Sequence, residues 1–328
     1  MAEKPSEITG DGTIASPYIV HNYDEIKWAC EDAEAIPEGQ TASIPVCIKL
    51  NNDIDCQTYA QDFEWAITCQ HSMDIDLNSK TIQTFYIVAK SYMFNLASTV
   101  TQFDLHDGAI LNIYGNWFDP SYAIFYINSV SSVFNVTNVS FSINASQFSN
   151  TDIIVRHPHS EAARSITSFA NCAFTIEGVL QPNVDYLFYY VQLFTCDFML
   201  NVSARDNNFV PYATCILQDC RVQGVVDDSA KTVSTGHYGL CYGALNIARN
   251  CVFDVEIILP TIVTTEKQFL ENSDSTYNYG IYNRDKLSPL IVFTNTNYIE
   301  CTTEDMDMRV NPHADVTLQE KGFDVIKG

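Results

Sequence analysis

The chain has 328 residues, 46% of them apolar, so it can bury a sizeable core and is not an intrinsically disordered protein. Its 40 acidic and 17 basic residues give a formal net charge of −23, which would repel a nucleic-acid backbone. No apolar run is long enough for a transmembrane helix, and the polar start of the chain lacks the apolar segment of a secretory signal, so we expect synthesis in the cytoplasm.

One short helix is predicted near the start of the chain, at residues 23–34 (YDEIKWACEDAE). Ile26, Ala29 and Cys30 fall on one face of this helix, and Asn22 is its expected N-cap. We interpret the helix as a cover for the open edge of the sheet that follows, because an uncovered edge would recruit strands from other chains. A partner-binding helix is the alternative.

Short patterns in which apolar and polar residues alternate follow this helix. Such period-two alternation is typical of strands with one buried face. Turn-forming Gly, Asn, Asp and Ser residues separate the patterns. The clearest patterns lie at residues 75–82, 105–115, 123–129 and 185–194.

A repeated motif, Asn-Cys-x-Phe-x-(Ile/Val), runs through the second half of the chain. Its cysteines recur at spacings of 24, 24 and 31 residues, and an apolar residue stands two positions after each of them. A first copy has Val139 in place of the cysteine, and a faint last copy has neither Cys nor Phe. The copies are NVSFSI (138–143), NCAF (171–174), TCDF (195–198), DCRV (219–222), NCVF (250–253) and NTNY (295–298).

This repeat predicts an all-β fold, a right-handed parallel β-helix (a solenoid) with a short N-terminal capping helix. Strands that recur at this period without helical patterns between them do not fit alternating strands and helices. Stacked turns of such a coil lie about 4.8 Å apart, so we expect Cys over Cys and Phe over Phe inside it, each turn covered by its neighbours. The right-handed sense follows the general bias of parallel connections.

The chain contains eleven cysteines. Their odd number, the lack of a secretory signal and the lack of any CxxC pair predict free thiols that are buried as small hydrophobic side chains. A zinc site is the alternative, but no paired ligand spacing supports it.

Three stretches near the N-terminus resemble a known family. They are GDGTIASPYIVHNYDEIKWACED (10–32), IKLNNDIDC (48–56) and IDLNSKTI (75–82), and the closing EKGFDVI (320–326) is weakly similar as well. They resemble the opening of right-handed parallel β-helix proteins encoded by bacteriophages and gut bacteria. The resemblance implies the fold, whereas the same coil serves pectin-type lyases, tailspikes and structural fibres.

The expected organisation has three parts. Residues 1–40 would form an N-terminal extended segment and the capping helix, and residues 41–302 the parallel β-helix. The last part, residues 303–328, loses the alternating pattern and would cap the coil or dock on another subunit.

Two carboxylate pairs are candidates for the catalytic groups of a glycosidase, which needs two carboxylates about 5–10 Å apart. They are Asp104 with Asp107 and Asp227 with Asp228, and we expect all four to be ordinary solvated side chains. A lyase of the resembling fold would use Asp-bound calcium with a basic residue, but the arginines of this region belong to no motif: Arg156, Arg164, Arg205 and Arg221.

His157 and His159 are the best candidate metal pair, because residues two apart face the same way on an extended backbone. A surface loop is the simpler interpretation, since no third ligand is predicted nearby. We therefore predict no catalytic, cofactor-binding or metal-binding residues.

These observations lead us to expect a non-catalytic structural component of a phage virion, as head fibre, capsid decoration or tail-associated protein. Its partners would be its own copies, in a homotrimer, and other capsid or tail proteins, without nucleic acid or a membrane span. The alternative is a tailspike-like polysaccharide depolymerase or an adhesin that binds a host surface glycan.

Overall fold

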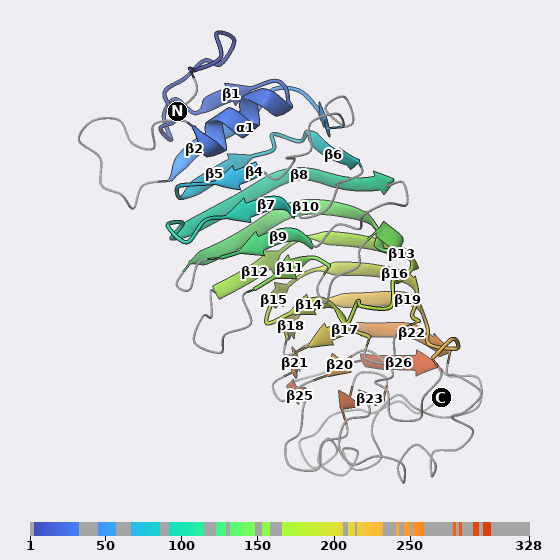
Figure 1. Cartoon of the computed structure of the whole chain (residues 1–328). Helices are drawn as coiled ribbons and strands as arrows, with labels where there is room; N and C mark the ends of the chain where they lie inside the picture. Colours follow the sequence, from blue (N-terminus) through green and yellow to red (C-terminus); the bar gives the residue numbers. More distant parts are fainter. Residues whose placement is uncertain are drawn as a thin grey trace. The chain divides into compact units, whose positions relative to one another are not determined.

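The computed structural model (Figure 1) describes the chain with gaps, and the last described residue is Thr302. The fold is a parallel β-solenoid, and the described residues contain one α-helix, as predicted; the handedness stays a prediction. The predicted boundaries near residues 40 and 302 also stay predictions, and the tail 303–328 lies outside the described residues. The described ranges are 3–32, 45–56, 67–85, 92–114, 123–128, 132–147, 153–157, 166–205, 209–213, 215–231, 241–242, 246–249, 252–258, 278–279, 282–283, 291–294 and 298–302.

The chain divides into two compact units, and unit 1 comprises residues 1–143 and 154–173. Its main sheet is a column of parallel strands far apart in sequence: β1 (Tyr18–Val20), β2 (Val46–Leu50), β5 (Met73–Asp76), β8 (Gln102–Tyr114), β10 (Val133–Asn144) and β12 (Ile166–Ala170). Two short strands, β3 (Ile54–Asp55) and β6 (Thr81–Phe85), continue it alongside β8. A second parallel sheet contains β4 (Ile67–Cys69), β7 (Tyr92–Leu96), β9 (Ala123–Ile127) and β11 (Val155–Arg156).

Unit 2 comprises residues 144–153 and 174–328. A short 3-10 helix, η2 (Ala145–Gln147), lies at its start. Its strands form parallel columns: β13 (Ala173–Val179), β16 (Asp197–Ser203), β19 (Arg221–Asp227), β22 (Val252–Ile258) and β26 (Tyr298–Thr302) in one; β15 (Gln192–Phe194), β18 (Ile216–Gln218), β21 (Asn246–Arg249) and β25 (Ile291–Thr294) in another; β14 (Tyr186–Tyr189), β17 (Val210–Ala213) and β20 (Cys241–Tyr242) in a third. Strands β23 (Asn278–Tyr279) and β24 (Tyr282–Asn283) form an antiparallel pair.

Aromatic rings are stacked inside each unit, and the stack in unit 2 joins two phenylalanines of the repeat, as predicted. In unit 2, the rings of Phe174 and Phe198 stack with their centroids 4.9 Å apart and their planes 4° from parallel. Phe198 pairs in register with Val222 on the next strand. In unit 1, Phe103 stacks on Phe134 at 5.1 Å. Parallel stacking recurs because each turn repeats the one before it, so the same side chain returns to the same place.

The cysteines of the repeat are buried free thiols, as expected. Cys172, Cys196 and Cys220 are all buried, and the Cys220 thiol donates to the carbonyl of Leu193 at 3.4 Å. Cys196 and Cys220 directly precede the paired residues Asp197 and Arg221 of neighbouring strands. Burial raises the pKa of one other thiol, Cys56, to about 12, so that thiol stays protonated. The fourth repeat cysteine, Cys251, lies outside the described residues.

The first residue of each of four motif copies, which precedes the buried Cys or Val139, lies at a corner of the coil. Asn138, Asn171, Thr195 and Asp219 have φ angles of 56°, 52°, 52° and 55°, which is the left-handed region. Asn and Asp tolerate this region better than other residues with a side chain, which explains why the motif starts with Asn or Asp. Thr195 is the exception, because a β-branched side chain is strained there.

Replacing Thr195 with Asn should therefore stabilise unit 2 by about 1 kcal/mol. The backbone hydrogen bond from Thr195 to the Gln218 carbonyl (2.8 Å) does not involve the side chain and would remain. Urea unfolding followed by circular dichroism would measure the gain. Thr195→Val, which keeps the branched shape, is the control and should give no gain; equal stabilisation by both variants would refute the explanation.

The last copy of the repeat is placed one residue from its predicted position. The motif aligned Tyr298 with Phe253, but the strands pair Phe253 with Ile299 and Val252 with Tyr298. A shift of one residue exchanges the two faces of a strand. NTNY is therefore not a copy of the motif in its predicted frame.

Helix α1 (Tyr23–Glu31) begins at the predicted cap. The Asn22 side chain accepts a hydrogen bond from the Glu25 backbone at 3.0 Å, and the Glu25 carboxylate accepts from the His21 backbone at 2.8 Å. The helix packs on β1 and β4. The segment before β1 pairs with this strand, because the backbone amide of Ile19 in β1 donates a hydrogen bond to the carbonyl of Thr9. This arrangement fits the predicted role of a cover for the sheet edge.

Candidate functional site: a polar cleft on unit 1

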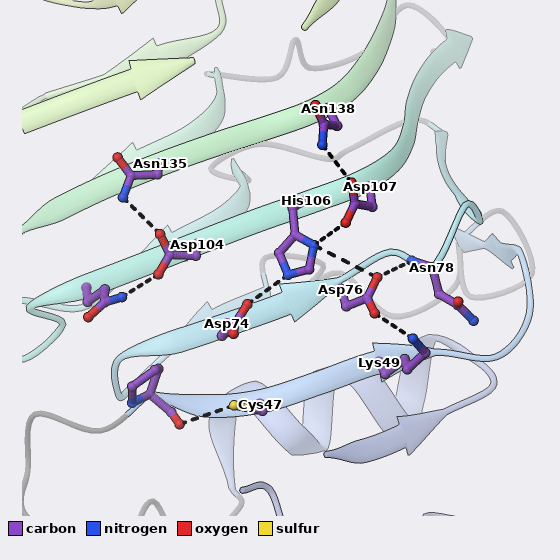
Figure 2. Close-up of polar contacts among 12 residues, drawn as sticks. Cys47, Lys49, Asp74, Asp76, Asn78, Asp104, His106, Asp107, Asn135 and Asn138 are labelled. Atoms are coloured by element: carbon purple, nitrogen blue, oxygen red, sulfur yellow. Dashed lines mark hydrogen bonds and ion pairs between the residues drawn. The ribbon is translucent and has the colours of Figure 1, made fainter. Parts of the chain in front are cut away.

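Polar side chains gather on the outer face of the main sheet of unit 1 (Figure 2). Alternation sends the apolar residues of β2, β5 and β8 inward and the intervening polar residues outward. The parallel register then aligns the outward residues of successive strands. Lys49, Asp76 and His106 form one such row, and Asp74 and Asp104 belong to the next.

Charged residues of the first row form ion pairs with carboxylates on the same or a neighbouring strand. Lys49 Nζ lies 2.7 Å from Asp76 Oδ2. His106 Nε2 lies 3.0 Å from Asp74 Oδ1, and His106 Nδ1 lies 2.8 Å from Asp107 Oδ2. His106 therefore lies between the carboxylates of two neighbouring turns.

Side-chain hydrogen bonds continue the second row onto β10 and β12, and another joins Asp107, next to His106, to β10. Asn138 donates to Asp107 Oδ1 at 2.9 Å. Asn135 donates to Asp104 Oδ1 at 2.9 Å and accepts from the hydroxyl of Ser168 at 2.7 Å. Each turn of unit 1 in this region is thus linked to the next by side chains as well as by the backbone.

A broad, open cleft of about 630 Å³ lies beside the first row. Corner residues form part of it, since Asn78, Ser79, Asp107 and Asn138 all have positive φ angles. Gly108 lets the turns pack closely, because a Cβ there would lie 2.4 Å from the Cβ of Leu77. The lining residues are Lys49, Asp76, Asn78, Ser79, Asp107, Gly108, Ala109 and Asn138.

Asp76, His106 and Asp107 bring possible ligand atoms within 4.8 Å of one another. Their donors and acceptors are already engaged, however. Both ring nitrogens of His106 face carboxylates, and Asp76 and Asp107 also hold Lys49 and Asn138. We interpret the set as an ion-pair cluster, in which each carboxylate keeps further lone pairs.

The four carboxylates that the sequence offered as catalytic candidates have different surroundings. Asp104 and Asp107 both take part in the side-chain links described above. Asp227 accepts from the Ser229 backbone at 2.9 Å and from the Ser203 hydroxyl at 3.2 Å. The expectation of a solvated side chain is wrong for Asp228, which is fully buried and forms an ion pair with Lys231 at 3.0 Å. A buried charge needs such a partner, and Lys231 had not been singled out from the sequence.

The proposed metal pair is only partly described, and the surface-loop interpretation is wrong for His157. This side chain is buried, its Nε2 lies 3.4 Å from the Thr167 hydroxyl, and burial lowers its pKa to about 4. His159 and Arg164 lie outside the described residues. Arg156 is half-buried, and Arg205 and Arg221 are exposed.

Most residues of the cluster were not predicted as a site. Lys49, Asp74, Asp76 and His106 stand at alternate strand positions in IKL, MDID and DLHD, so their outward direction was predictable. Their contacts depend on the register between turns about 30 residues apart, which alternation alone does not define.

Comparisons with known proteins add little about function. No protein-family model and no curated protein matches the chain. A solved structure described as a "putative immunoglobulin A1 protease" from Bacteroides ovatus matches with 15% identity and a TM-score of 0.46, covering 75% of this chain and 79% of that one. A match with such low sequence identity and TM-score gives no information on the activity of this chain. Within the described residues, no helix has the length and apolar character needed to cross a membrane.

Proposed function

We propose that the protein is a non-catalytic structural solenoid and a component of a bacteriophage particle, as head fibre, capsid decoration or tail-associated protein. The observation that carries the non-catalytic part is the pairing of the outer carboxylates of unit 1. Asp74, Asp76, Asp104 and Asp107 each hold a side chain of the same or a neighbouring turn. These carboxylates link one turn of unit 1 to the next through side-chain contacts.

Electrostatics support the same proposal. A general acid needs a carboxyl group whose pKa is raised toward neutrality. Hydrogen bonds from Asn138 and His106 instead hold the pKa of Asp107 below its usual range. Asp107 is therefore an anion under ordinary conditions, suited to ion pairing.

The particle assignment starts from the resemblance of residues 10–32, 48–56 and 75–82 to β-helix proteins of bacteriophages and gut bacteria, which implies the fold and leaves the role open. Strong negative charge favours solubility of a protein made in many copies. We further propose a homotrimer that attaches to other virion proteins, through the segment before Tyr18 or through the tail after Thr302.

Mass spectrometry of purified virions tests this assignment. We expect the protein in particles of the phage that encodes it, at a constant ratio to the major capsid protein. Sedimentation of the recombinant protein should give a trimer. Abundant protein in infected lysates, without any in purified particles and with a monomer in solution, would contradict the proposal.

The cleft of unit 1 favours a second candidate, a host-glycan adhesin or depolymerase. Its amide, hydroxyl and carboxylate groups, from Asn78, Ser79, Asp107 and Asn138 among others, are of the kind that hydrogen-bond to sugar hydroxyls. Incubation with capsular polysaccharide separates the candidates, with new reducing ends and unsaturated products as the readout. Product formation that is lost in Asp76→Asn and Asp107→Asn would favour the depolymerase over the structural role.

A further inference from the structure

His106 has an unusual position among the polar residues of unit 1, because both of its ring nitrogens face carboxylates. Nε2 lies 3.0 Å from Asp74 Oδ1 on β5, and Nδ1 lies 2.8 Å from Asp107 Oδ2. A neutral imidazole has one N–H donor and one lone pair. It can therefore satisfy only one of these two carboxylates, and its lone pair would face the other. Only the imidazolium donates to both.

We propose that His106 is a pH-dependent bridge that, in its protonated form, holds strand β5 to strand β8 and orients the corner at Asp107. The Asp107 corner also connects β8 to β10, because the Asp107 carboxylate accepts a hydrogen bond from the Asn138 amide. Deprotonation would break one of the two contacts of His106 and leave a carboxylate facing a lone pair. This inference stands on geometry and does not depend on the proposed virion role.

The charges on β5 and β8 favour the protonated form of His106. On β5, Asp74 lies in contact and Asp76 Oδ1 lies 4.0 Å from Nδ1. On β8, its own strand, Asp107 lies in contact, and Asp104 is two residues away. From β2, Lys49 is the one opposing charge in this group, and its ammonium is paired with Asp76. From β10, Asn135 and Asn138 are uncharged.

The direction of the pH effect follows from this balance. Partial burial alone would lower the pKa of His106, but Asp107, Asp74 and Asp76 outweigh it and raise the pKa above 6.5. The charged bridge forms in the folded state, so the stability it contributes is fully present below the ordinary pKa of 6.5 and is lost as pH rises through the raised value. Since Asp76 and Asp107 also line the cleft, its walls would loosen over the same range.

His71 provides a matched control within unit 1. Burial lowers its pKa below 6.5, so its effect on stability has the opposite sign, being lost as pH falls. The experiment compares the wild type, His106→Gln and His71→Gln by thermal unfolding at about pH 5.5 and about pH 8.5, on either side of the histidine range. Proton NMR of the imidazoles gives the individual pKa values in the wild type and in Asp74→Asn.

We expect the melting temperature lost in His106→Gln to be greater at the lower pH, and the loss in His71→Gln to be greater at the higher pH. The pKa of His106 should exceed 6.5 in the wild type and fall in Asp74→Asn. A His106 pKa at or below 6.5 would overturn the proposal. So would an equal loss at both pH values in His106→Gln. If that variant does not fold, the NMR titration of the wild type decides alone.

Discussion

Replacing Lys231 with Met is expected to destabilise unit 2 by about 3–5 kcal/mol, because it leaves the Asp228 carboxylate buried without its counter-ion. Both side chains are 0% exposed, and their charged atoms lie 3.0 Å apart. Lys231 also donates to the carbonyl of Phe209 at 2.8 Å. Urea unfolding monitored by far-ultraviolet circular dichroism would measure the loss.

The matched control removes both charges. Lys231→Met combined with Asp228→Leu should recover most of the stability, since replacing a whole buried ion pair by apolar groups is often neutral. The recovery isolates the cost of the lone carboxylate from the cost of changed packing. A double variant as unstable as the single one would show that shape at this position matters more than charge.

Replacing Gly224 with Ala is expected to cost about 3–5 kcal/mol, from backbone strain together with overpacking. Gly224 has a φ of 114°, a conformation that residues with a side chain rarely adopt. A Cβ there would lie 1.9 Å from the carbonyl oxygen of Leu200, its partner on β16. Strands β16 and β19 would have to separate.

Met199→Ala is the control for this prediction. Met199 lies next to Leu200 on the same strand but is 47% exposed, so truncation should change stability by no more than about 0.5 kcal/mol. Urea midpoints of the two variants, compared with the wild type, provide the test. A mild effect of Gly224→Ala would mean that the two turns do not approach each other as closely as described.

The architecture could be predicted from the sequence because two separate patterns in it indicate the same fold. Alternation gave the strands, and the recurrence of Cys and Phe gave the register, as the stack of Phe174 on Phe198 shows. The corner role of Asn171 and Asp219 was not foreseen. It required φ angles, and Asn and Asp occur in many kinds of turn.

The candidate site could not be predicted in the same way. Lys49, Asp76 and His106 come from strands about 30 residues apart in sequence, and no motif aligns them. The buried positions of His157 and Asp228 were missed for a related reason, since a polar residue near a strand end looks solvated until its packing partners are known. Where the motif was faint, at Tyr298, the predicted register was wrong by one residue.

Turns distant in sequence lie side by side in parallel register, and engineered disulfides test this arrangement most directly. Asp197 and Arg221 are exposed, paired residues of β16 and β19, so Asp197→Cys with Arg221→Cys should form a disulfide on mild oxidation, detected by peptide mass spectrometry. Asp197→Cys with Gln223→Cys, two residues out of register, should form little. Failure of the first pair to cross-link, or equal cross-linking of both pairs, would contradict the account.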